Sequence, residues 1–276
     1  ISYENDWNVQ SSFLRQLTQR APDLKPGTAI VYQYTPALQE VHFSDNSLTA
    51  ILNWVYDPDF SGQELPYYLY DLRLRSDQVI SNLADGIPFH SEYGVYAFSG
   101  SSEDVLVVQF AYPWCLQVLQ PQYMRLYPNL PYYLDRSVKY SNLRVIESDT
   151  NTPAGLPDEI FSSDPDPDWC FYYQQADLAR QRGDWHIVAE IGDLAFFLDD
   201  PPKQPTEYLP YVQGYGYVGR WDRAVDLTLE AIREDEHTQP ILCLIWADLE
   251  ENTLDTIEKE RGIARVMVQM ECREGE

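Results

Sequence analysis

The chain has 276 residues, of which 44% are hydrophobic and 23% charged, and its formal net charge is −25. This length is sufficient for two folded domains, and the composition is that of a globular protein rather than a disordered one. The strong negative charge repels phosphate backbones, so we expect no binding to nucleic acid.

No apolar run in the sequence reaches the roughly 20 residues that a membrane-spanning helix needs. The first six residues, Ile1 to Asp6, have neither the basic nor the apolar region of a signal peptide. Because the chain also begins without an initiator Met, we interpret it as part of a longer natural polypeptide.

The cysteines and histidines show no metal-binding pattern. The four cysteines, Cys115, Cys170, Cys243 and Cys272, include no CxxC pair, and none of the four histidines lies at a metal spacing. We therefore expect neither a metal site nor a cofactor. The apolar surroundings of Cys115 and Cys243 predict buried thiols, and they leave the redox compartment open.

The first 148 residues combine helix and strand patterns. Apolar side chains recur at helical spacing over residues 5–20, and the β-branched segment 28–34 predicts a strand. A short helix is predicted over 48–56, ended by Asp57-Pro58. A hairpin is predicted over 93–111 with its turn at 99–102, and 115–119 predicts a further strand. These elements predict a small α/β (or α+β) domain over residues 1–148, with its strand order open.

The segment 149–168 is rich in Pro and Asp, which predicts a linker. Beyond it, Gly183-Asp-Trp185 recurs as Gly219-Arg-Trp221, a shift of 36 residues, and the helical spacing of apolar residues recurs with it. Helix, glycine-containing turn and helix at such a period are typical of tetratricopeptide repeats. Residues 169–276 are therefore predicted to form an all-α domain of tetratricopeptide-like helical hairpins.

The order of several motifs resembles a known arrangement. These motifs are Ser44-Asp-Asn-Ser-Leu-Thr49, Leu52-Asn-Trp-Val-Tyr56, Cys115-Leu-x-Val-Leu-x-Pro121 and Trp169-Cys-x-Tyr-Tyr173. The pattern is similar to the C-terminal soluble region of large multi-pass bacterial membrane proteins related to lipid-linked-sugar glycosyltransferases. The resemblance spans most of the chain. It implies a membrane-tethered module outside the cytoplasm, covalently linked to a membrane domain upstream of Ile1.

No nucleophile elbow, phosphate-binding loop or dinucleotide-binding motif occurs in the sequence. His42 and Asp45 could form an acid–base pair, but no nucleophile motif accompanies them, and helix capping by Ser44 to Ser47 explains the polar cluster without catalysis. We therefore expect a non-catalytic interaction or bracing module, with no catalytic residue, that binds a protein or a glycan. The alternative is a free-standing carbohydrate-active hydrolase, which needs two carboxylates facing one cleft.

In stacked helical hairpins the first helices line the concave side. The sequence therefore predicts a binding groove lined by Tyr173, Asp177, Arg180, Gln213 and Tyr217. In the alternative interpretation, the repeats only brace the α/β domain. The two tryptophans that open the second helices, Trp185 and Trp221, are predicted to be core residues. The pairs Tyr67-Tyr68 and Tyr132-Tyr133 each follow a proline and could stack on a sugar or pack against the sheet.

Overall fold

The computed structural model describes residues 2–34, 45–72, 88–147, 153–157, 161, 166–270 and 272. The chain divides into two compact units. Residues 1–125 and 130–165 form the first, termed here the α/β unit, and residues 126–129 and 166–276 form the second, the helical unit. Most of the predicted linker, 149–168, lies outside the described residues.

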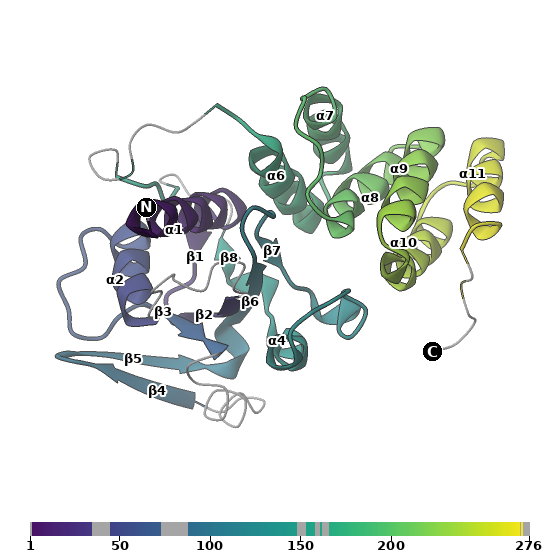
Figure 1. Cartoon of the computed structure of the whole chain (residues 1–276). Coiled ribbons are helices and arrows are strands. Elements are labelled where there is room, and N and C mark those ends of the chain that lie inside the picture. Colours follow the sequence, from purple (N-terminus) through teal and green to yellow (C-terminus); the bar gives the residue numbers. More distant parts are fainter. Residues whose placement is uncertain are drawn as a thin grey trace. The chain divides into compact units, whose positions relative to one another are not determined.

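The α/β unit combines helices with a mixed sheet (Figure 1). Its helices and strands are α1 (Ser2–Arg20), β1 (Asp23–Leu24), β2 (Thr28–Tyr34), α2 (Asp45–Tyr56), β3 (Tyr67–Asp71), β4 (Pro88–Tyr93), β5 (Tyr96–Ser101), β6 (Val105–Phe110), β7 (Gln117–Val118), α4 (Tyr132–Ser137) and β8 (Ile146–Glu147). The main sheet has the order β3-β2-β6-β7, in which β2 is parallel to β3 and β6 while β7 is antiparallel to β6. Single 3-10 turns span Ser102–Asp104, Pro121–Tyr123, Val138–Tyr140 and Leu143–Val145.

The main sheet is covered on both faces. On one face, Phe13 of α1 packs against Tyr32 and Phe110, with ring centroids 5.9 and 5.5 Å apart. On the other face, Phe98 of β5 lies 5.3 Å from Tyr68 of β3. Double coverage explains why β3 and β6 are buried along their whole length and do not alternate apolar with polar residues. The helices predicted near 5–20 and 48–56 and the strand predicted at 28–34 are all present.

The predicted hairpin over residues 93–111 is wrong in both its turn and its partners. The hairpin is β4–β5, in which Tyr93 pairs with Tyr96. Gly94 begins the turn with φ 62°, a left-handed conformation that glycine adopts without steric cost and that suits a two-residue hairpin turn. The predicted turn at 99–102 instead leads from β5 into β6, which pairs in parallel with β2.

The helical unit is a series of hairpins. Its helices are α6 (Trp169–Arg182), α7 (Trp185–Ala195), α8 (Leu209–Tyr217), α9 (Trp221–Glu234), α10 (Gln239–Asn252) and α11 (Ile257–Met267), with 3-10 turns at Pro205–Tyr208 and Glu236–Thr238. Each helix from α6 to α8 packs on the next one. In addition α8 packs on both α6 and α10, and α11 packs on α9, so alternate helices are also neighbours (Figure 1).

The first two hairpins turn in the same way. Gly183 and Gly219, which lie 36 residues apart, have φ values of 77° and 78°. In both turns the residue after the glycine donates its N–H to the carbonyl four residues before the glycine, at 3.0 and 2.8 Å. This is the hydrogen-bonded end of a helix that a left-handed glycine provides. The recurrence found in the sequence is therefore a recurrence of backbone geometry as well.

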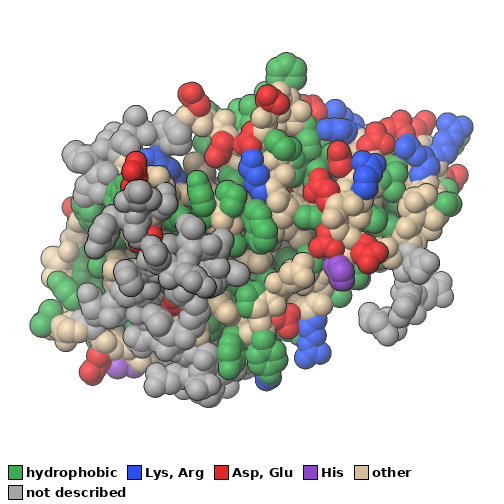
Figure 2. Space-filling view, viewed as in Figure 1, with side chains coloured by type: hydrophobic (Ala, Val, Ile, Leu, Met, Phe, Trp, Pro, Cys, Tyr) green, Lys and Arg blue, Asp and Glu red, His purple; other side chains and the backbone are tan. Residues whose placement is uncertain are grey.

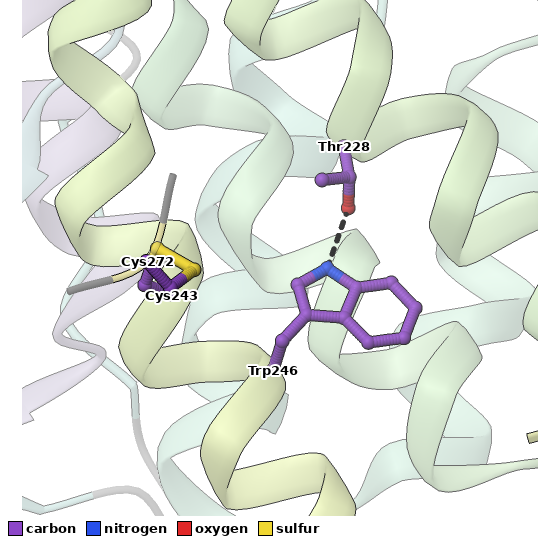
Figure 3. The surroundings of a disulfide bond; sticks show 4 residues. All are labelled: Thr228, Cys243, Trp246 and Cys272. Carbon is purple, nitrogen blue, oxygen red and sulfur yellow. Dashed lines mark hydrogen bonds between the residues drawn. A yellow bond between two sulfur atoms is a disulfide. The ribbon is translucent and has the colours of Figure 1, made fainter. Parts of the chain in front are cut away.

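Helix α10 is joined to α9 by a buried hydrogen bond and to the segment after α11 by a disulfide (Figure 3). Trp246 Nε1 donates to Thr228 Oγ1 at 2.9 Å, and both side chains are buried. Cys243 of α10 forms a disulfide with Cys272, which follows α11. The prediction of free thiols is thus wrong for both cysteines, because Cys243 and Cys115 are disulfide-bonded. The predicted burial is correct for Cys115. Apolar neighbours in the sequence indicate burial, but a partner 29 residues away reaches Cys243 only through the fold.

The described surface carries the strong acidity of the composition. Figure 2 shows Asp and Glu side chains spread among Lys and Arg over the helical elements. Within the described part of the chain, no helix is both long enough and apolar enough to cross a membrane.

Candidate functional site

The residues predicted to line a groove come together between the first helices of the helical unit. Tyr173, Asp177 and Arg180 lie on α6, and Gln213 lies on α8. Arg180 Nε donates to Asp177 Oδ1 at 2.9 Å, and its NH1 lies 3.4 Å from Gln213 Oε1. Burial, together with the nearby carboxylates of Asp177 and Glu207, raises the pKa of the Tyr173 phenol well above its ordinary value.

These side chains do not line an open groove. Tyr173, Asp177 and Gln213 are buried, and the side chain of Arg180 is only 9% exposed. The prediction placed them on a concave surface, but α6 packs against both α7 and α8. Residues beside the apolar stripe of α6 are therefore buried: Asp177 and Arg180 pair within α6, and Arg180 reaches Gln213 of α8.

Tyr217, the fifth predicted residue, also has a structural role. It stacks on Trp185 with ring centroids 4.0 Å apart and an interplanar angle of 6°, and its hydroxyl donates to Asp248 at 2.7 Å. These contacts join α7, α8 and α10. The predicted core role holds for Trp221, which is buried, whereas Trp185 is only partly buried.

An open cavity lies instead in the α/β unit, and we term it the aromatic pocket. Its volume is about 200 Å³. Its lining residues are Ala50, Asn53, Trp54, Asp57, Pro58, Phe60, Leu65 and Tyr96. Trp54 is 42% exposed and Tyr96 is 40% exposed, and the Phe60 ring centroid lies 6.4 Å from that of Tyr96. Three aromatic rings therefore surround a space large enough for one side chain or one small ring.

Three segments build the aromatic pocket. The last turn of α2 supplies Trp54, and Asp57 continues that turn, with its N–H bonded to the carbonyl of Asn53 at 2.8 Å. The following loop supplies Phe60, and Leu65 joins this loop to β5 by donating its N–H to Ala97 O at 2.7 Å. The β5 strand supplies Tyr96, so the pocket is formed by segments held in place by backbone hydrogen bonds.

The aromatic pocket is electrostatically negative. Asp57 is the only charged side chain among the described residues that line it, and the carbonyl end of α2 adds a partial negative charge. The faces of Trp, Tyr and Phe rings are also negative, because of their quadrupoles. This combination attracts a cation that has an apolar stem, such as a Lys or Arg side chain.

The sequence contained one signal for this pocket. Leu48, Leu52 and Val55 form the buried stripe of α2, and Trp54 falls outside it. A large aromatic residue on the solvent side of an amphipathic helix is a candidate for ligand contact. Of the tyrosine pairs considered as sugar platforms, Tyr67 and Tyr68 are buried in the sheet, whereas Tyr132 is 64% exposed.

Metal-ligating side chains do not cluster in the described residues. No group of three or more His, Cys, Asp or Glu side chains in this part of the chain could hold a metal ion. His42 lies outside the described residues, as does the Asp45 side chain. No family model matches this chain, and comparison with curated proteins and with solved structures finds no similar chain.

Proposed function

We propose that this chain is a non-catalytic interaction module that binds a partner protein by inserting a Lys or Arg side chain of the partner into the aromatic pocket. The observation that carries this proposal is the combination of Trp54, Phe60 and Tyr96 with Asp57 in one cavity. A cation over an aromatic face gains on the order of 0.5–2 kcal/mol, and a carboxylate beside it adds to the attraction. The net charge of −25 favours basic partners generally and speeds their encounter.

The same pocket argues against the alternative of a carbohydrate-active hydrolase at this place. Hydrolysis of a glycosidic bond uses two carboxyl groups on either side of the bond. Asp57 is the only carboxylate among the described residues that line the cavity. Binding of a cation by aromatic faces does not need a second carboxylate, so the composition of the pocket favours binding over hydrolysis.

We further propose that the helical unit is a tetratricopeptide-like array that braces the module. The equal turns at Gly183 and Gly219 and the packing of alternate helices support this assignment. The Arg180–Gln213 contact between α6 and α8 and the Trp185–Tyr217 stack between α7 and α8 support bracing rather than a groove, because these side chains already contact neighbouring helices.

The proposed setting is outside the cytoplasm, as part of a glycosyltransferase-like membrane protein. The disulfide between Cys243 and Cys272 supports an oxidising compartment, since the cytosol keeps such pairs reduced. The membrane tether rests on the resemblance of the sequence motifs. Sequencing the complete gene tests it, because membrane-spanning segments upstream of Ile1 are expected.

Titration of the whole chain with short peptides tests the binding proposal. Peptides that contain Arg or Lys should bind, and the same peptides with Gln in those positions should not. Trp54→Ala, Tyr96→Ala and Asp57→Asn should each weaken binding by about tenfold, which corresponds to about 1.4 kcal/mol. Trp114, which is 41% exposed in the same unit but outside the pocket, provides the matched control Trp114→Ala.

Calorimetry or intrinsic tryptophan fluorescence can measure the affinities. Higher salt should weaken the binding, because the attraction is partly electrostatic. Equal binding of Arg and Gln peptides would contradict the proposal. Binding of neutral oligosaccharides that is lost in Trp54→Ala would instead assign the pocket to a glycan.

A further inference from the structure

A second cavity of the α/β unit has the opposite charge. It has a volume of about 300 Å³ and is lined by Met124, Arg125, Tyr132, Asp135, Arg136 and Lys139. Three cations and one carboxylate give it a local charge of +2 (3 − 1), in a chain that has 44 acidic and only 19 basic residues. We term it the anion pocket. Its volume is at the lower end of the range of small-molecule sites, about 300–1,000 Å³.

The cations of the anion pocket have no ion-pair partner within the described part of the chain. Among the described residues, no carboxylate forms an ion pair with Arg125, Arg136 or Lys139, although Asp135 lines the same cavity. By contrast, Arg220 pairs with an Asp at 2.7 Å on the helical unit. Three unpaired cations around one cavity repel one another, and an anionic ligand removes this repulsion.

Arg125 also has an unfavourable backbone conformation. Its φ is 67°, in the left-handed region, where a residue with a side chain costs on the order of 1 kcal/mol relative to its ordinary conformations. Glycine would adopt this conformation without that cost. Strained positions of this kind cluster at ligand sites. The presence of Arg rather than Gly at position 125 therefore supports a role of the Arg125 side chain in binding.

Tyr132 adds a surface for a ring. It is 64% exposed, and its hydroxyl accepts a hydrogen bond from Arg136 NH1 at 2.6 Å. The Arg136 guanidinium carbon also lies 5.5 Å from the centroid of the Tyr132 ring, and the ring of Tyr133 contacts Tyr132 edge-on at 5.3 Å. These contacts hold the Tyr132 ring beside the cations and leave most of it open to solvent.

We propose that the anion pocket binds an anionic sugar, whose ring stacks on Tyr132 and whose phosphate or carboxylate is held by Arg125, Arg136 and Lys139. The Arg guanidinium offers paired N–H donors that match two oxygens of a phosphate or carboxylate. The Tyr132 face presents negative charge to the weakly positive C–H groups of a sugar ring. This site is separate from the aromatic pocket and does not depend on the binding proposed there.

Calorimetric titration of the whole chain with four probes tests the proposal. The probes are glucose 6-phosphate, glucuronate, glucose and inorganic phosphate. At least one anionic sugar should bind about tenfold more tightly than glucose and than inorganic phosphate, because only it uses both parts of the site. The comparison of glucose 6-phosphate with glucuronate shows whether the anion is a phosphate or a carboxylate.

Variants assign the binding to this pocket. Lys139→Gln and Arg125→Gly should each weaken binding of the anionic sugar about tenfold. Arg125→Gly also relieves the left-handed strain, so the loss of binding should come without a loss in urea midpoint, which excludes misfolding as its cause. Tyr132→Ala should weaken binding of the anionic sugar and leave inorganic phosphate unchanged.

The matched control is Arg144→Gln, which removes one exposed cation of the same unit from outside the cavity. Its affinity for the anionic sugar should equal that of the unaltered chain. The proposal is overturned if no anionic sugar binds more tightly than glucose and inorganic phosphate. It is also overturned if Arg144→Gln weakens binding as much as Lys139→Gln, because general charge would then be the cause.

Discussion

Asn53 of α2 exchanges two hydrogen bonds with the backbone of Tyr67 at the free edge of β3. Tyr67 N donates to Asn53 Oδ1 at 3.0 Å, and Asn53 Nδ2 donates to Tyr67 O at 2.8 Å. Two residues further along β3, Leu69 N donates to Thr49 Oγ1 at 3.1 Å. Among the described strands β3 has no neighbour on this side, and side chains of a helix bond there instead, which protects an edge that could otherwise pair with another chain. The same contacts hold the end of α2 beside the loop that completes the aromatic pocket.

Asn53→Leu should lower the stability of the α/β unit by about 2–4 kcal/mol, because it leaves two buried backbone groups of Tyr67 without partners. Thr49→Val should lower the stability by about 1–3 kcal/mol, because it leaves only the N–H of Leu69 without a partner. Urea unfolding followed by circular dichroism measures both. Thr18→Val is the matched control, since the Thr18 hydroxyl bonds only to carbonyls of its own helix and its loss should change stability little. Unchanged unfolding of Asn53→Leu would show that β3 does not need these bonds.

Replacement of Cys243 and Cys272 by Ser should destabilise the end of the helical unit by about 3–4 kcal/mol, the loop-closure entropy for a separation of 29 residues. Helix α11 lies within that loop, so its amide protons should exchange much faster in the double variant. Hydrogen exchange detected by mass spectrometry measures this. The urea midpoint of the α/β unit serves as the internal control and should not move. Equal exchange of α11 in both proteins would mean that packing alone holds this helix.

Gly216→Ala should destabilise the contact between α8 and α10, because the added Cβ would lie 2.5 Å from Cδ1 of Leu249. Overpacking of this kind costs about 1–3 kcal/mol. Leu249→Ala alone should cost about 2–5 kcal/mol by leaving a cavity. The double variant should be less destabilised than the sum of the two, since the new methyl group enters the vacated space. Thermal unfolding of the unaltered chain, the two single variants and the double variant gives the coupling free energy between the two positions. If the two effects simply add, Gly216 and Leu249 are not in contact, and the helices lie further apart than described.

Tyr215 should stay protonated in the folded chain at pH values where free tyrosine ionises. Burial, and then the hydrogen bond that its hydroxyl donates to Asp193 at 2.9 Å, raise its pKa from 10.0 to about 12. Between these values the unfolded state has already lost the proton and the folded state has not. Stability therefore falls as pH rises from about 10 to about 12, while below pH 10 the residue causes no pH dependence.

Tyr215→Phe should reduce this alkaline loss of stability, measured as the shift of the urea midpoint with pH. Asp193→Asn should bring the Tyr215 pKa partly back toward 10.0, because it removes the second cause and leaves burial. The ultraviolet absorbance of tyrosinate, taken as the difference between each protein and Tyr215→Phe, reports this pKa. The same pKa in Asp193→Asn and the unaltered chain would assign the whole shift to burial.

Local patterns in the sequence were sufficient for most helices, for β2 and for the glycine turns. Helical spacing and the φ preference of Gly183 and Gly219 act over a few residues, so neighbours along the chain contain the information. The character of each part of the chain follows from these patterns: a sheet with helices in the first part and helical hairpins in the second.

Pairing, burial and pocket formation were decided by the tertiary structure. The segment 105–110 is apolar whether it pairs with β5 or with β2, and only the sheet selects β2. Tyr173 could face solvent or a neighbouring helix, and the packing of α6 on two helices buries it. The aromatic pocket joins Trp54 to Tyr96, which lie 42 positions apart in the sequence (96 − 54). Contacts of this kind depend on how the chain closes on itself, and no short window of sequence contains them.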